Sequence, residues 1–217
     1  MIKLFEQFNN EQEIREICEK YNIKNYIINT DGNIDVDGNI NLSSRGLFKL
    51  PLKFNVVSGV FYCNDNNLIS LEGCPKEVGG NFSCVANKLK SLIGSPKIVG
   101  GVYTCSDNYI TSLEECPERV GKFINLNNNQ LTSLEGCPIM IGDDLSIQYN
   151  PISIIDTSIQ VKGKIHIKYT NFDDKVKSLS QEKLKILFEH GIDYNIFDKD
   201  GNVNHSRLER IFKDFGV

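Results

Sequence analysis

Seven cysteines are the side chains of this 217-residue chain best suited to metal binding or covalent chemistry. Six of them recur at two positions of a repeat about 21 residues long: Cys63, Cys84 and Cys105 at one, Cys74, Cys116 and Cys137 at the other. Elsewhere these two positions hold Leu42, Leu126, Ile147, Ser95 and Ser158. A position that accepts Cys, Leu or Ile is typical of a packed core, and no CxxC pair favours zinc. We therefore predict buried free thiols, against the alternatives of disulfides or a metal site.

The remaining reactive residues form no recognisable catalytic motif. The sequence contains no GxxxxGK[ST], HExxH or GxSxG, and its three histidines are scattered along the chain. The run from Asp198 to Gly201 resembles part of a calcium loop, but loop positions one and twelve would be Ile196 and Arg207, which are not calcium ligands. We interpret this run as a turn and predict no enzyme activity, cofactor or metal. A nucleotide-binding or enzymatic site in the C-terminal segment is an alternative.

The elements that position these residues belong to a repeat between Ile40 and Ile165. Its segments begin at Ile40, Phe61, Phe82, Tyr103, Ile124 and Leu145; five are 21 residues long and the last is 20. In each segment the first and third residues have the period of a strand. Pro and Gly leave little room for a helix on the return leg. Asn66, Asn87, Asn108, Asn129 and Asn150 follow the strands, and we expect their amides to form a ladder that links neighbouring turns.

The repeat resembles the leucine-rich repeat, L-x-x-L-x-L-x-x-N-x-L. The phrases SLEGCPKEVGGNFSCVANKL and TSLEGCP are similar to the Asn- and Cys-rich repeats of small bacteriophage leucine-rich repeat proteins. The chain departs from the family pattern where Gly79, Gly100, Gly121 and Gly142 replace a leucine, so we expect a short strand on the return leg. The resemblance implies an α/β-type solenoid dominated by β structure, with six to seven turns of 20–21 residues. It also implies a phage-encoded protein that binds and blocks or scaffolds a host protein, such as a component of a defence system.

The two ends of the chain depart from the repeat. We expect an N-terminal cap over residues 1–39, made of a helix that starts at Asn10 and an extended segment. The solenoid follows over residues 40–171, and a helical C-terminal cap over residues 172–217. Gly191 is expected to end the first C-terminal helix, and Asn204 to begin the last one. An alternative role for these C-terminal helices is interaction or dimerisation.

A partner is expected to bind the outward residues of the strands, at repeat positions two, four, five and seven; we call this surface the strand face. The predicted protein-binding residues are Tyr62, Asn64, Asp65, Asp107, Tyr109, Asn127, Gln148, Tyr149, His166 and Tyr169. The surface is polar and nearly neutral, and tyrosine contributes large rigid area with a polar tip at interfaces. The alternative interpretation is a solvated sheet face without a partner. The convex face and the C-terminal helices are further alternatives for binding.

The charge and hydropathy of the chain restrict its partners and location. Its net charge of −4 and pI near 5.5 argue against broad attraction to nucleic acid or anionic lipid. It has no run of 18 apolar residues and no signal-peptide core. We therefore expect a cytoplasmic protein, in the host cytosol if phage-encoded, that is a monomer or a weak homodimer through its terminal helices. A virion or structural assembly component is the alternative.

Overall fold

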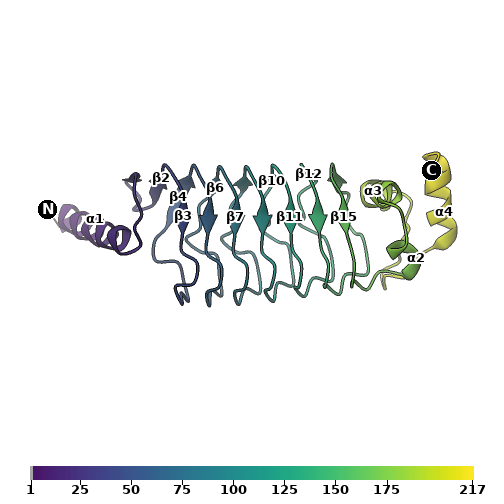
Figure 1. Ribbon diagram of the computed structural model, residues 1–217, viewed down its shortest axis with the longest axis horizontal. Coiled ribbons are helices and arrows are strands. Elements are labelled where there is room, and N and C mark those ends of the chain that lie inside the picture. The colour runs from purple at the N-terminus through teal and green to yellow at the C-terminus, as the bar shows by residue number, and fades with distance from the viewer. Residues whose placement is uncertain (1) are drawn as a thin grey trace.

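A computed structural model describes residues 2–217, with the side chains from Asn10 onward. The chain winds into a solenoid of six turns with helices at both ends (Figure 1). The predicted solenoid of 20–21-residue turns dominated by strands is confirmed. No helix in residues 2–217 has the length and apolar character that crossing a membrane requires.

Two sheets run along the solenoid. The seven-stranded sheet contains β3 (Ile40–Asn41), β5 (Phe61–Tyr62), β7 (Phe82–Ser83), β9 (Tyr103–Thr104), β11 (Ile124–Asn125), β13 (Leu145–Ser146) and β15 (Ile165–His166). The eight-stranded sheet lies on the return leg and contains β1 (Tyr26–Ile28), β2 (Ile34–Val36), β4 (Phe54–Val57), β6 (Glu77–Val78), β8 (Ile98–Val99), β10 (Arg119–Val120), β12 (Met140–Ile141) and β14 (Gln160–Val161). The expected return-leg strand is therefore present.

The register of the sheets follows the repeat. Neighbouring strands are parallel and mostly pair residues 21 apart, as in Phe61 with Phe82. The spacing is 20 across the shorter last turn, where Leu145 pairs with Ile165, and at a register shift between β2 and β4, where Ile34 pairs with Phe54. Only β1 is antiparallel to its neighbour, β2. In each two-residue strand of the seven-stranded sheet the first side chain points into the core. The second points outward, because side chains alternate along a strand.

The core consists of columns of identical repeat positions. Phe61, Phe82 and Tyr103 stack with ring centroids 5.9 and 5.4 Å apart, and the Tyr103 hydroxyl lies 2.9 Å from the Ser95 hydroxyl. All seven cysteines are buried and free, which confirms the predicted structural thiols. Burial raises the pKa of the Cys116 thiol well above its usual value and that of Cys137 to about 12. The thiols of Cys116 and Cys137 are therefore packing groups that stay protonated.

The predicted asparagine ladder is present. Each asparagine Oδ1 accepts from a backbone N–H of the preceding turn, as Asn87 does from Leu68 at 3.0 Å. Each Nδ2 donates to the preceding turn and to its own turn, as Asn87 does to Cys63 O at 3.0 Å and Cys84 O at 3.1 Å. Asn66, Asn108, Asn129 and Asn150 repeat this arrangement. One side chain per turn thus satisfies backbone groups that the bend removes from the sheet.

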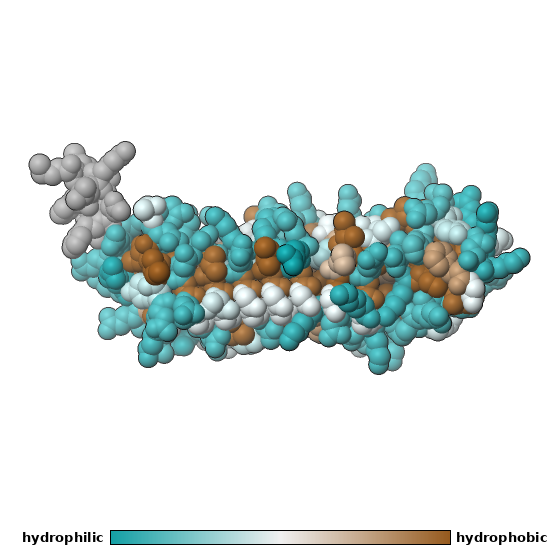
Figure 2. All heavy atoms as spheres, turned by 90° about the horizontal axis from the view of Figure 1, so that it is seen from above, coloured by the Kyte–Doolittle hydropathy of each residue, from teal (hydrophilic) through white to brown (hydrophobic). Residues whose placement is uncertain are grey.

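A column of glycines explains the departure from the leucine-rich pattern. A Cβ added at Gly100 would collide with the carbonyl oxygen of Gly79, and one at Gly121 with that of Gly100. Figure 2 looks onto this edge and shows a straight row of pale, near-neutral residues beside apolar ones. Glycine is required here because the tight turn between the two sheets brings successive backbones into contact.

Helices lie at both ends of the solenoid. The first is α1 (Ile2–Lys20), so the prediction of a helix start at Asn10 is wrong: Asn10 lies inside the helix. The capping sequence at Asn10 does not mark the helix start, because an asparagine in a helix interior costs less than about 1 kcal/mol and the helix continues through it. At the other end lie α2 (Asp174–Lys177), α3 (Gln181–His190) and α4 (His205–Asp214). The expected C-cap Gly191 and N-cap Asn204 are confirmed.

The last turn is closed by a side chain that acts like a further strand. The amide of Gln181 accepts from Ile165 N–H at 2.7 Å and donates to Ile165 C=O at 2.9 Å. Lys185 Nζ donates to Lys162 O at 2.8 Å, and the Ile159 N–H donates to Phe188 O at 2.9 Å. Helix α3 therefore covers both β14 and β15, which leaves fewer backbone groups open to another chain.

Candidate binding face

The strand face is the surface turned toward the viewer in Figure 1. Of the ten predicted binding residues, five are half-buried on or beside the strands: Tyr62, Asn64, Asn127, Gln148 and His166. The other five are exposed where the chain leaves the strand: Asp65, Asp107, Tyr109, Tyr149 and Tyr169. All ten lie along the seven-stranded sheet, but they do not converge on one pocket.

Several of the predicted binding residues also connect neighbouring turns; Asp107 Oδ1, for example, accepts from Asn128 Nδ2 at 2.6 Å. Asn64 Oδ1 accepts from Ser83 Oγ at 2.5 Å and from the Val85 N–H at 2.9 Å. Asn127 Oδ1 repeats this with Ser146 Oγ at 2.7 Å and the Gln148 N–H at 2.8 Å. Only the amide nitrogen of each side chain is left to interact with a partner. The two asparagines therefore stiffen the face in addition to lining it.

The fifth position of each turn has a left-handed backbone. The φ angles lie between 53° and 60° at Ser44, Asp65, Ala86, Asp107, Asn128, Tyr149 and Tyr169. Asp and Asn adopt this conformation readily, but other non-glycine residues lose about 1–2 kcal/mol in it. Tyrosine is thus an unfavourable choice for the backbone at the last two of these positions, and its presence needs another cause.

Tyr149 and Tyr169 form a stacked pair. Their ring centroids are 4.4 Å apart with an angle of 16° between the planes. The rings are on the surface, with Tyr149 53% and Tyr169 66% exposed. Partial desolvation is the main cause that raises the pKa of Tyr149, and the neighbouring Tyr169 hydroxyl raises it further. Tyr62 and Tyr109 lie on other turns, so the structure brings together two of the four tyrosines.

His166 has a partner that the sequence did not single out. Its Nε2 lies 3.1 Å from Asp144 Oδ2, while Asp144 Oδ1 accepts from the Lys164 N–H at 2.6 Å. The Lys164 N–H, and then His166, lower the pKa of Asp144. At the equivalent position of an earlier turn, Asn81 Oδ1 accepts from the Val102 N–H in the same way. An Asn or Asp directly before a strand was therefore the sequence signal for a side chain that accepts from the next turn.

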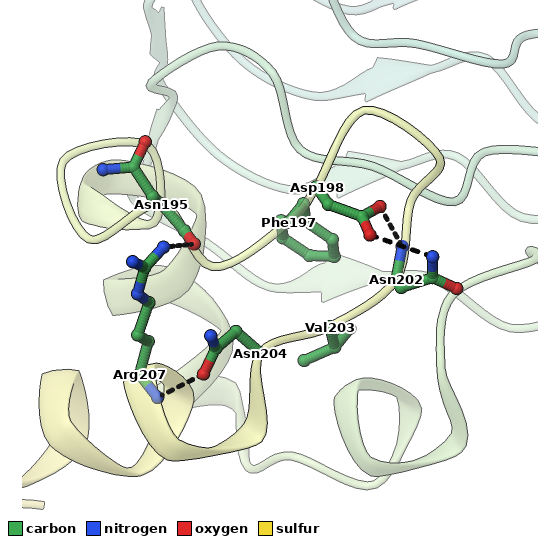
Figure 3. A pocket seen from close by; sticks show the side chains of 7 residues that line it. All are labelled: Asn195, Phe197, Asp198, Asn202, Val203, Asn204 and Arg207. Carbon is green, nitrogen blue, oxygen red and sulfur yellow. Dashed lines mark hydrogen bonds between the residues drawn. The ribbon is translucent and has the colours of Figure 1, made fainter.

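The C-terminal segment contains an open hollow of about 570 Å³ (Figure 3). Arg207 Nη1 donates to Asn195 O at 3.1 Å on one side of it. The Asp198 carboxylate accepts from the Asp200 and Asn202 N–H groups, both at 2.9 Å, and from Asn202 Nδ2 at 2.9 Å. The Asp198 carboxylate is thus hydrogen-bonded within its own loop, which confirms the interpretation of the run from Asp198 to Gly201 as a turn.

Neither a metal centre nor a known relative accounts for these features. Among the side chains described, from Asn10 to Val217, no three His, Cys, Asp or Glu residues are placed to hold a metal ion. No protein-family model matches the sequence, and neither does any curated protein. The chain is a β-solenoid of six turns, and the strand face is an extended surface of aligned side chains along its seven-stranded sheet.

Proposed function

We propose that this protein is a non-enzymatic binding module that recognises another protein through the strand face. The observation that carries the proposal is the Tyr149–Tyr169 pair. Two aromatic rings are held in an unfavourable backbone conformation at exposed positions, where burial offers no compensation. Strain of this kind is typically retained where it serves recognition.

The surroundings of the pair suit a protein surface. Exposed tyrosines supply large rigid contact area, and their hydroxyls can donate and accept hydrogen bonds. Gln148 and the free amide nitrogen of Asn127 add donors nearby. Seven strands spaced about 4.8 Å apart give a face about 30 Å long, which matches the dimension of a standard protein–protein interface.

The proposed mechanism is occlusion or scaffolding. A partner that lies along the face would have its own surface covered without any chemical step. The resemblance of the repeats to those of small phage leucine-rich repeat proteins favours a phage protein that blocks a host protein, such as a defence component, in the host cytosol. This origin and target are part of the proposal and rest on the repeat phrases alone.

The experiment replaces both tyrosines with the residue that their backbone prefers. Tyr149→Asn with Tyr169→Asn relieves left-handed strain and loses a stack worth about 0.5–1.5 kcal/mol, so the melting temperature should change little. The tagged protein and this variant are used for capture from a bacterial lysate, followed by mass spectrometry and titration of the captured protein. We expect at least tenfold weaker binding by the variant.

A matched control lies on the opposite side of the molecule. Ile139→Ala with Met140→Ala removes two exposed apolar side chains, 68% and 58% exposed, from the return leg. This control should bind as the wild type does. Equal binding by the tyrosine variant, or loss of binding only in the control, would remove the strand face from consideration.

A further inference from the structure

The exposed charges are unevenly distributed along one edge of the solenoid, the edge that lies lowest in Figure 1. We define this lower rim as repeat positions five to fourteen of the six turns, where the chain bends from the seven-stranded sheet into the return leg. In the first three turns it holds five exposed cations and two carboxylates: Arg45, Lys49, Lys53, Lys88, Lys90, Asp65 and Glu72. In the last three turns it holds five exposed carboxylates and no cation: Asp107, Glu114, Glu115, Glu135 and Asp156.

The cations of the lower rim are not neutralised within the molecule. Among the side chains described, from Asn10 onward, none of the five takes part in an ion pair. Phe48 and Ile69 lie among them on adjacent turns, and are 70% and 68% exposed. The acidic half instead carries the exposed rings of Tyr109 and Tyr149. The first half thus combines an excess of unpaired positive charge with apolar surface, and the second half combines negative charge with exposed aromatic rings.

We propose that two copies of the chain associate antiparallel through the lower rim. A two-fold axis between the third and fourth turns places the first turn of one copy opposite the sixth turn of the other. Lys88 and Lys90 then face the acidic fourth turn of the partner copy, and Phe48 faces the turn that carries Tyr149. A parallel arrangement would instead place like charges opposite each other.

The same geometry sets the strength of the association. In this register the second turn faces the fifth, so Glu72 and Glu135 oppose each other and subtract from the attraction. Six turns spaced about 4.8 Å apart give a rim about 29 Å long but narrow. A contact of this size is at the low end for specific interfaces. The dimer is therefore weak, concentration-dependent and sensitive to salt.

The arrangement has a consequence for the proposed function. The two-fold axis is perpendicular to the seven-stranded sheet, so the strand faces of both copies point to the same side. A partner with two epitopes would meet both faces at once and gain avidity. The dimer itself does not depend on the proposed function. Only the gain in avidity from two strand faces rests on it.

The experiment measures mass by sedimentation velocity at increasing protein concentration, from about 10 to 500 μM, in low salt. The wild type should shift from 24.5 kDa toward twice that mass, and should return to the monomer at about 1 M salt, where the Debye length is about 3 Å. Lys88→Glu with Lys90→Glu in the third turn should stay monomeric, and so should Glu114→Lys with Glu115→Lys in the fourth turn that it faces. An equimolar mixture of these two variants should dimerise again.

A charge-matched control separates the rim from net charge. Lys76→Glu with Lys97→Glu changes two exposed return-leg lysines and alters the net charge as the first variant does, from −4 to −8. It should dimerise as the wild type does. A wild type that stays at 24.5 kDa over the whole range, a monomeric control, or a mixture that stays monomeric would each overturn the dimer. Partner capture at submicromolar concentration tests the strand face separately.

Discussion

Replacing Asn108 with alanine tests whether the asparagine ladder holds successive turns together. Asn108 is only 6% exposed. Its Oδ1 accepts from the Leu89 N–H at 3.1 Å. Its Nδ2 donates to three carbonyl oxygens, those of Cys84, Cys105 and Ser106, at 3.0, 3.3 and 3.1 Å. The substitution removes all four hydrogen bonds and leaves the side chains of the core columns in place.

The cost depends on which backbone groups keep another partner. Each of the three carbonyls retains a donor: Asn87 Nδ2 for Cys84, Asn129 Nδ2 for Cys105 and the Ala86 N–H for Ser106. The Leu89 N–H has no second acceptor among the described hydrogen bonds. An orphaned buried donor costs about 1–3 kcal/mol, and the weakened carbonyl bonds add about 1 kcal/mol. We therefore expect the free energy of unfolding to fall by about 2–4 kcal/mol.

Denaturant unfolding followed by circular dichroism measures this loss. Asn67→Ala is the control, because Asn67 is half-exposed and its side chain makes none of the described hydrogen bonds; it should change stability by less than about 0.5 kcal/mol. Asn108→Asp keeps the acceptor for Leu89 but turns an oxygen toward three carbonyls. It should be least stable at neutral pH and recover as the new carboxyl is protonated. If Asn108→Ala unfolds like the control, the ladder does not stabilise the solenoid.

Three further outcomes are expected. The six cysteines of the repeat should resist alkylation in the native protein at pH 8, because all six are buried and burial raises the pKa of thiols such as Cys74 and Cys84. Mass spectrometry should show them labelled only after unfolding. Rapid labelling of the native protein would contradict their assignment to the core. The Lys164 N–H and His166 lower the pKa of Asp144, so the ionised carboxylate stabilises the fold at pH values above its ordinary pKa of 3.8, and this stability is lost as the pH falls through the lower folded-state pKa. Asp144→Asn should remove that part of the acid sensitivity in unfolding curves between about pH 2 and 5. An unchanged pH profile in the variant would refute this role of Asp144. Gln181→Ala should expose the β15 edge, lower stability by about 1–3 kcal/mol and promote aggregation detectable by light scattering, whereas unaltered stability and mass would mean that α3 closes the edge without this amide.

The repeat columns could be predicted from the sequence. The exchange of Cys105 with Leu126 and Ile147 at one position indicated a core column, and the structure buries all three. The asparagines were predictable for the same reason, because an amide recurring at the end of a strand has backbone groups to satisfy.

The misses have identifiable causes. Helix α1 begins at Ile2 rather than after Asn10, since a local capping sequence cannot decide whether the preceding residues are helical. The cross-turn bonds of Asn64 and Asn127 were missed because an outward asparagine looks the same whether it meets solvent or the next turn. Gln181 gave no signal at all, since its role depends on where α3 packs.

The sequence by itself determined the period, and with it which residues share a column, because parallel strands in register place every twenty-first residue side by side. Only the tertiary structure decided how each column is used. The left-handed backbone at Tyr149 and Tyr169, the stacking of their rings and the grouping of charge along the lower rim all depend on how the coil bends between its two sheets. That bend arises from contacts between turns, and no single repeat contains them.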